Sequence, residues 1–346
     1  MSPCDVLIVG GTGFMGARTA RVLADAGHRV TVLSRHGAAG DGRIRHVVAD
    51  RGDPAALARV IEGARFDFCV DFCAFDAADV EGLLLVPYAA LGRYVLISTG
   101  QVYLSTEASR MPYREADSDY PLKPEPPAGS SEHSQWSYGV GKRRAESALM
   151  ALRASHGVRA VALRLPIIQG EGDPSLRLWA WLERMLDGGP LLLPEGGTGP
   201  TRFLYAGDVA RALLMLLEAP PPREPAYNLA QPDILSLREF LERVAAQAGL
   251  RPKFVDVSVE EAAAAGLPPL FVPFYGPWTS VLDPALATAE WGFSGTRLDD
   301  YLPAVVRWHL EERPAVSHAG YASRTLERQL AERLERPALT GRKSGR

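Results

Sequence analysis

The chain has 346 residues, of which 47% are hydrophobic and 23% charged, and its formal net charge is −3. This length fits two domains or one large α/β unit with an appended part, and the composition excludes a wholly disordered chain. The charge gives no basic field for nucleic acid or an anionic membrane, and no apolar run approaches the roughly 20 residues of a membrane span. The N-terminus has no signal-peptide pattern and three cysteines make no disulfide framework, so we expect a cytoplasmic protein without a metal site.

The first half of the chain alternates apolar runs with helical patterns. Strands are expected near residues 5–9, 29–34, 47–49, 67–72, 93–99 and 158–164, and helices near residues 14–26, 54–64, 76–91 and 135–156. Runs that are apolar at almost every position are typical of parallel strands covered on both faces. The predicted fold class is α/β, a Rossmann-type doubly wound parallel sheet with a smaller C-terminal substrate domain.

The remaining segments are less regular. Residues 104–134 are rich in Pro, Ser, Glu and Asp and read as a long loop. Beyond residue 164, helices are expected over 175–187, over 208–217 and from an N-cap at Ser236 to residue 248. The tail from residue 314 has helical spacing and is either solvated, docked or a dimer contact.

A glycine-rich turn joins the first predicted strand to the first predicted helix. Its residues are Gly10, Gly11, Thr12, Gly13, Phe14, Met15 and Gly16. The absent side chains let the backbone approach a pyrophosphate, and the helix N-terminus adds N–H groups and the positive end of its dipole. In this strand–turn–helix context we predict dinucleotide binding rather than a mere tight turn.

The end of the second predicted strand distinguishes NADP from NAD. An acidic residue there would bind the ribose 2′-hydroxyl and repel a 2′-phosphate, but this chain has Ser34 and Arg35. Ser34 can donate a hydrogen bond and Arg35 can pair with phosphate, with Arg18 expected nearby, so NADP is favoured over NAD. Alternatively, Arg35 is solvated or stacks on adenine only. Asp50 is placed to accept from the adenine amino group, or is a plain loop acid, and Arg51 joins the predicted cofactor-binding set.

Tyr138 and Lys142 lie four residues apart, on one face of a predicted helix. A nearby cation favours the phenolate of a tyrosine, whose pKa is ordinarily about 10, and this suits proton transfer near neutral pH. A surface pair is the alternative, but Lys142 is one of only four lysines in the chain. Thr99 ends the fifth predicted strand, where its hydroxyl is placed to hold a substrate oxygen.

Together these residues resemble the short-chain dehydrogenase/reductase superfamily, in its extended branch with the NAD-dependent epimerase/dehydratases. Further matching stretches are Ala49-Asp50, residues 97–103, Leu163-Arg164, residues 203–210 and residues 227–230. The resemblance implies that Thr99, Tyr138 and Lys142 are the catalytic set. It also implies that Phe72, Cys73 and Ala74 line the cofactor. The segment of Pro166, Ile167 and Ile168 is implied to run past the nicotinamide ring.

At two sites the sequence differs from well-known members of the family, and these differences limit the reactions and substrates to be expected. Nucleotide-sugar 4,6-dehydratases carry an Asp-Glu pair after the catalytic Thr, whereas this chain has Gly100 and Gln101. UDP-galactose 4-epimerases carry a phosphate-contacting Asn where this chain has Ile167. Residues 70–84 and 98–104 look most like a sub-branch with the chloroplast stem-loop RNA-binding proteins, which look to have lost the Tyr–Lys pair kept here.

The resemblance implies an NAD(P)-dependent oxidoreductase or epimerase acting at a hydroxyl-bearing carbon of a sugar-like, nucleotide-sugar or other small hydroxy-carbonyl substrate. The alternative is a cofactor-bound RNA-binding or scaffold protein, which the net charge and the retained triad disfavour. We expect a small-molecule substrate and neither nucleic acid nor membrane as a partner, and a homodimer stays open. The Rossmann domain is assigned to residues 1–165 and about 200–232, the substrate domain to 166–199 and 233–312, and a helical, partly flexible tail to 313–346.

Overall fold

The computed structural model describes residues 2–37, 42–61, 63–84 and 91–335. The chain divides into two compact units. Unit 1 comprises Met1–Gly172, Arg202–Ile234 and Pro277–Tyr301, and unit 2 comprises Asp173–Thr201, Leu235–Gly276 and Leu302–Arg346. Relative to the boundaries expected from the sequence, residues 166–172 and 277–301 fall in unit 1. The substrate-binding role of the second part stays a prediction.

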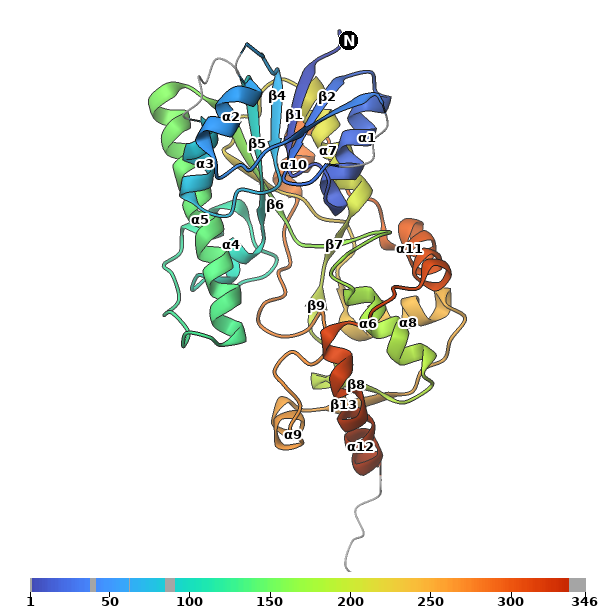
Figure 1. The fold of residues 1–346 in the computed structure, drawn as a ribbon. Helices are drawn as coiled ribbons and strands as arrows, with labels where there is room; N and C mark the ends of the chain where they lie inside the picture. The colour runs from blue at the N-terminus through green and yellow to red at the C-terminus, as the bar shows by residue number, and fades with distance from the viewer. Residues whose placement is uncertain (1, 38–41, 62, 85–90, 336–346) are drawn as a thin grey trace, which may run out of the picture. The chain divides into compact units, whose positions relative to one another are not determined.

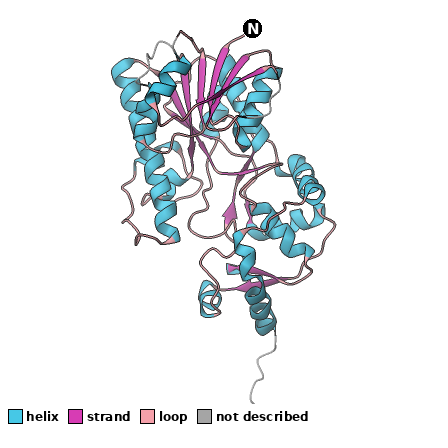
Figure 2. Cartoon of the chain, in the orientation of Figure 1, coloured by secondary structure: helices cyan, strands magenta, loops and turns pink. Residues whose placement is uncertain are grey.

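Unit 1 is built on a parallel sheet, whose strands are magenta in Figure 2. The sheet has seven strands in the order β11-β6-β5-β4-β1-β2-β3. Its strands are β1 (Asp5–Val9), β2 (Arg29–Ser34), β3 (Ile44–Val48), β4 (Phe68–Asp71), β5 (Arg93–Thr99), β6 (Arg159–Leu165) and β11 (Ala226–Asn228). The predicted fold class is confirmed. The chain runs outward from β1 to β3 and then outward on the other side from β4 to β11, so the strand order reverses between β1 and β4. Open α/β sheets bind ligands at such a switch point.

Helices cover both faces of this sheet (Figure 1). One face packs against α1 (Phe14–Asp25), α7 (Ala206–Glu218) and α10 (Ala285–Trp291), and the other against α2 (Pro54–Ile61), α3 (Ala77–Leu84) and α5 (Ser131–His156). In β1, Val6 and Ile8 belong to the first apolar cluster and Leu7 and Val9 to the second. Because both faces are buried, the strand is apolar at nearly every position.

The remaining elements of unit 1 lie in segments that the sequence left irregular. They are α4 (Gln101–Leu104), the 3₁₀ turn η2 (Glu115–Asp119), and the parallel pair β7 (Ile167–Gln169) and β10 (Phe203–Tyr205). The helix α5 begins at Ser131, before the expected residue 135, because the Ser130 hydroxyl caps it by accepting a hydrogen bond from the His133 N–H. The end of the helix predicted over 76–91 includes residues 85–90, which lie outside the described residues.

Unit 2 is made of helices and two short strand pairs. Strands β8 (Leu191–Pro194) and β13 (Phe254–Val257) pair parallel, and β9 (Pro200–Thr201) and β12 (Leu235–Ser236) pair antiparallel. The expected cap at Ser236 is confirmed by a reciprocal capping box with Glu239. The other elements are α6 (Arg177–Leu186), η3 (Glu195–Gly197), α8 (Leu237–Gln247), α9 (Val259–Ala264), η4 (Ala319–Ser323) and α12 (Arg324–Glu335), with α11 (Leu298–Glu312) crossing from unit 1 into unit 2.

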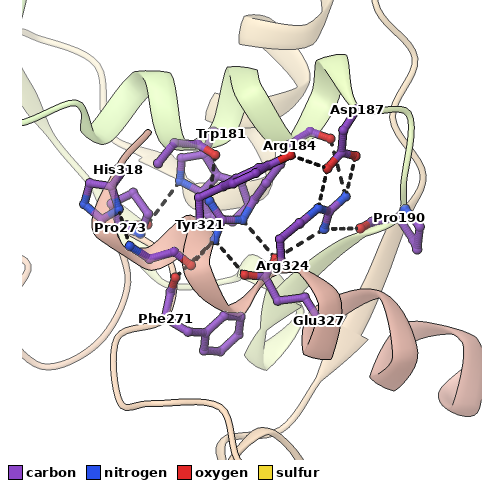
Figure 3. Close-up of polar contacts among 12 residues, drawn as sticks. Trp181, Arg184, Asp187, Pro190, Phe271, Pro273, His318, Tyr321, Arg324 and Glu327 are labelled. Atoms are coloured by element: carbon purple, nitrogen blue, oxygen red, sulfur yellow. Dashed lines mark hydrogen bonds and ion pairs between the residues drawn. The ribbon is translucent and has the colours of Figure 1, made fainter. Parts of the chain in front are cut away.

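Helix α12 is fastened to α6 by buried ion pairs (Figure 3). Arg184 contacts Glu327 at 2.6 Å, and both side chains are almost fully buried. Arg324 pairs with Asp187 at 2.6 Å and donates a hydrogen bond to the Pro190 carbonyl. Residues 324–335 of the tail therefore form a docked helix, which is one of the alternatives that the sequence left open. No helix among the described residues is long and apolar enough to cross a membrane.

Candidate active site

The glycine-rich turn lies at the switch point between β1 and β4. Gly10 has a φ of +82°, and a side chain there would overlap the sulfur of Cys73, which follows β4. A Cβ at Gly16 would lie 2.5 Å from the Gly10 carbonyl oxygen. Gly13 caps α1 without any side-chain hydrogen bond, and the first turn of α1 has no acidic residue. This open helix N-terminus, with the exposed Thr12 beside it, fits the phosphates of a dinucleotide.

Two other predicted cofactor segments lie at the same edge of the sheet, because parallel strands end together. Phe72, Cys73 and Ala74 follow β4, and Pro166, Ile167 and Ile168 follow β6. Burial raises the pKa of the Cys73 thiol, so it is neutral at physiological pH. Cys69 lies in the apolar core. Among the described residues, no cluster of His, Cys, Asp or Glu could hold a metal ion.

Ser34 and Arg35 lie at the carboxyl end of β2. The Ser34 hydroxyl donates to the His36 carbonyl at 2.7 Å, and Arg35 is exposed to solvent. Arg18, expected near them, instead pairs with Glu171 at 2.8 Å and donates to the Tyr205 hydroxyl. The predicted help of Arg18 toward a 2′-phosphate is therefore not supported, because its guanidinium already has a carboxylate partner.

Asp50 and Arg51 have different surroundings although they are adjacent. Asp50 is exposed, and its carboxylate accepts from the Gly52 N–H at 2.9 Å. Arg51 turns inward and donates to both oxygens of Asp71, at 2.7 and 2.8 Å. The buried Asp71 also accepts from the Tyr94 hydroxyl. Arg51 therefore fixes the end of β4, a packing role not foreseen from the sequence, and its contact with a cofactor stays a prediction.

Lys142 on α5 is buried against the ends of two strands. Only 2% of it is exposed, and its ammonium donates to the carbonyls of Ala74, at 2.7 Å, and Ile97, at 2.8 Å. Burial lowers the pKa of Lys142 to about 8, although the nearby carboxylate of Asp71 acts in the opposite direction. Lys142 is thus not a surface residue. Tyr138, one turn earlier on the helix, is 39% exposed.

The two glycines between Tyr138 and Lys142 let neighbouring segments touch the helix. A Cβ at Gly139 would lie 2.5 Å from the Gln101 carbonyl oxygen, and one at Gly141 would lie 2.6 Å from the Phe75 carbonyl oxygen. Each glycine costs a helix interior about 1 kcal/mol relative to alanine, so a close backbone approach explains their presence. Sequence reasoning missed this role, although two glycines inside a predicted helix are its signal.

Thr99 is the last residue of β5, just before the segment that touches Gly139. Its hydroxyl oxygen accepts from the Gln101 N–H at 3.3 Å, and the Gly100 N–H donates to the Leu165 carbonyl at 2.8 Å. A Cβ at Gly100 would lie 2.7 Å from the Ser280 Cβ. Packing against Ser280 therefore leaves no room for the acid that dehydratases carry at this position. Gln101, two residues after Thr99, is the residue that contacts Gly139, next to Tyr138, and a direct approach of Thr99 to Tyr138 stays a prediction.

A buried network behind the candidate site anchors α5 to the sheet. Glu146, one turn beyond Lys142, pairs with Arg164 on β6 at 2.7 Å and accepts a hydrogen bond from Ser98 on β5. Arg164 also donates to the Tyr103 hydroxyl at 2.8 Å. The role of Glu146 was not foreseen from the sequence. Its signal was an acid placed four residues after the rare lysine, on the same helical face.

Residues 6–230 of the chain match the NAD dependent epimerase/dehydratase family. The chain belongs to this family. The predicted resemblance is confirmed, and the chain is an NAD(P)-dependent enzyme of the oxidoreductase or epimerase kind.

Two curated proteins illustrate the range of relatives. A 2′-dehydrokanamycin reductase of Streptomyces kanamyceticus is 30% identical over 264 residues, 75% of this chain and 70% of that protein. The chloroplast stem-loop binding protein of 41 kDa b of Arabidopsis thaliana is 25% identical over 264 residues, 72% of this chain and 64% of that protein.

Solved structures show the same fold. UDP-glucose 4-epimerase of Thermotoga maritima has a TM-score of 0.71 at 18% identity, covering 90% of this chain and 100% of that chain. A dTDP-glucose 4,6-dehydratase of Streptomyces venezuelae, solved with NAD, has a TM-score of 0.68 at 22% identity, covering 89% and 98%. At these identities the likeness concerns the fold alone.

Proposed function

We propose that this protein is an NADP(H)-dependent oxidoreductase that interconverts a carbonyl and a hydroxyl on a carbon of a small, sugar-like or other hydroxy-carbonyl substrate. The observation that carries the proposal is the burial of the Lys142 ammonium between the Ala74 and Ile97 carbonyls, one turn from Tyr138. A buried cation one helical turn from a phenol has a chemical role available that a surface lysine lacks. The likeness to a protein named as a reductase supports net reduction over epimerisation.

Three residues divide the work at the reacting carbon. Thr99 holds the substrate oxygen, Tyr138 transfers a proton to or from that oxygen, and Lys142 binds the cofactor ribose and favours the phenolate. The bound cofactor supplies or accepts the hydride. In the reducing direction the carbonyl carbon gains a hydride, its oxygen takes the proton of the Tyr138 hydroxyl, and a phenolate remains beside Lys142.

Elimination of water is not part of the proposed reaction. It needs an acid and a base beyond the tyrosine, and Gly100 and Gln101 supply neither. Glu115, a loop acid that could substitute, accepts from the Asn228 N–H at 2.8 Å, and Asp117 accepts from the Arg114 N–H at 2.7 Å. Both carboxylates are engaged by backbone groups of unit 1.

The substitution Tyr138→Phe tests the proposal. It removes only the hydroxyl of a half-exposed tyrosine, so we expect turnover to fall by about 10²–10⁴-fold while the fold and the dissociation constant for NADPH are kept. Tyr120→Phe, at another half-exposed tyrosine of unit 1, is the matched control and should keep full activity. Wild-type turnover in Tyr138→Phe would refute the assigned role.

A cofactor-bound RNA-binding protein is the second candidate, because a chloroplast stem-loop binding protein is among the relatives. Net charge −3 opposes it, since nucleic-acid affinity rests on basic contacts with phosphate. Gel-shift titration with stem-loop RNA at about 50 and 150 mM salt distinguishes the two candidates. Tight binding that weakens steeply with salt, without any hydride transfer, would favour the second.

A further inference from the structure

Phe75 presents an exposed aromatic ring beside the candidate catalytic pair. The residue is 52% exposed, and its ring centroid lies 6.4 Å from that of Tyr138, with the ring planes tilted by 50°. The Lys142 ammonium lies over the Phe75 ring, 4.8 Å from its centroid. Phe75 directly follows Ala74, the last residue predicted to line the cofactor on this segment, and has no role predicted from the sequence.

The position of this ring is set by its backbone. The Phe75 N–H donates to Asp79 at 2.7 Å, and the preceding carbonyl, of Ala74, accepts from Lys142. The Phe75 carbonyl oxygen lies close to Gly141. The next residue, Asp76, forms an ion pair with Arg144 at 2.5 Å. The segment is therefore held against α5 on both sides of Phe75, so the backbone that carries the ring has a fixed place.

A fixed, half-exposed phenylalanine forgoes stabilisation that burial would give. Burying an apolar side chain is favourable, so a partner that covers the open face of the ring gains part of that free energy. Scattered exposed apolar residues are ordinary. Phe75 differs from these because its ring, a second exposed ring and a buried ammonium adjoin one another where proton transfer is proposed.

We propose that Phe75 contacts the substrate directly, and that its exposed face beside Tyr138 is an apolar wall for a saturated ring of the substrate. The C–H face of a pyranose or cyclohexane ring would lie on Phe75 while the oxygen of the reacting carbon meets the Tyr138 hydroxyl. The inference rests on the proposed function and narrows its substrate class to cyclic compounds with an apolar face. Small acyclic ketones lack that face and gain nothing from the wall.

Binding of two simple ketones to the full-length protein tests this without turnover. Dissociation constants of cyclohexanone and acetone are measured by saturation-transfer NMR with NADP⁺ present. We expect Phe75→Ala to raise the dissociation constant of cyclohexanone about three- to tenfold, because apolar contact area is lost, and to leave the dissociation constant of acetone unchanged. The Phe75→Trp variant should bind cyclohexanone with the affinity of the wild type. Tyr120→Ala, at an equally exposed aromatic residue of unit 1, should leave the dissociation constants of both ketones unchanged.

Other outcomes separate the wall from its alternatives. Equal cyclohexanone affinity in the wild type and Phe75→Ala, or no preference of the wild type for the ring, would overturn the inference. A tenfold loss of NADP⁺ affinity in Phe75→Ala, measured by calorimetry, would assign the ring to the cofactor and also overturn it. If cyclohexanone binding depends on Phe75 but no carbonyl is ever reduced, the wall stands and the proposed reaction fails.

Discussion

Lys142 connects most of the proposed chemistry, because its ammonium is held by two backbone carbonyls at the strand ends. Burial lowers its pKa to about 8, so the ammonium is charged below that pH and neutral above it. The neutral amine stabilises neither the phenolate nor the cofactor ribose as well as the ammonium does. The state of this one side chain should therefore appear in the pH dependence of the reaction.

The efficiency of carbonyl reduction, kcat/KM, is expected to fall as the pH rises through about 8. In parallel, the Lys142 Cε resonance of lysine-labelled protein should titrate with a midpoint near pH 8, which is feasible because the chain has only four lysines. The Lys142→Met variant assigns that resonance. A midpoint above pH 10 would contradict the described burial.

Arg35 is the residue on which the proposed preference for NADP(H) rests. Arg35→Ala is expected to weaken NADP(H) about ten- to a hundredfold, since a hydrogen bond to a charged group contributes about 1.5–3 kcal/mol. NAD(H), which lacks the 2′-phosphate, should bind the variant and the wild type equally. Calorimetric titration measures both dinucleotides, with Arg21→Ala as the exposed-arginine control. Unchanged NADP(H) affinity would refute the preference.

Gly139 and Gly141 should tolerate no side chain. Gly139→Ala and Gly141→Ala place a Cβ at 2.5 and 2.6 Å from backbone oxygens, so both variants must separate α5 from a neighbouring segment. We expect each to lower activity at least tenfold and to destabilise unit 1, as read from turnover and thermal unfolding. Gly82→Ala, on α3 with no atom within 4 Å of the added Cβ, is the control and should stabilise by up to about 1 kcal/mol.

The packing of α12 against α6 depends on an ion pair that is buried away from solvent. Glu327→Gln leaves Arg184 buried without its carboxylate, and we expect a loss of about 3–5 kcal/mol in the free energy of unfolding of unit 2. Urea denaturation followed by circular dichroism measures it. Glu332→Gln, at an exposed position of the same helix, should stay within about 0.5 kcal/mol of the wild type. Equal stability of the two variants would contradict the network.

The elements that the sequence predicts well are those with an unbroken pattern. The strand at residues 5–9 and the helix that follows it are found as expected, because two-sided burial and a glycine turn leave local marks. The pair of β8 and β13 was not foreseen. Its strands have four residues each and pair across some 60 positions, so nothing local distinguishes them from loop. Buried ion pairs such as Arg184–Glu327 are not predicted from the sequence for the same reason, because a single charged residue in the sequence resembles a surface residue.

Across the whole chain, the sequence predicts which segments form the candidate site better than it predicts which residues those segments contact. Parallel topology alone brings the residues after β1, β4, β5 and β6 to one edge of the sheet. It does not reveal that Arg51 faces Asp71, or that residues 277–301 return to unit 1, where Ala287 and Phe293 pack into the core. Such contacts depend on the folded chain and not on any local period.

Transfer of a hydrogen isotope from the cofactor reports hydride transfer to a carbonyl carbon, with Tyr138 as the proposed proton donor. The protein is incubated with NADPH carrying deuterium at either face of nicotinamide C4 and with a panel of cyclic ketones and nucleotide sugars, and products are read by mass spectrometry. We expect an alcohol with one deuterium on the carbinol carbon, formed by the wild type and not by Tyr138→Phe. Absence of label from every product, or a product lighter by one water, would contradict it.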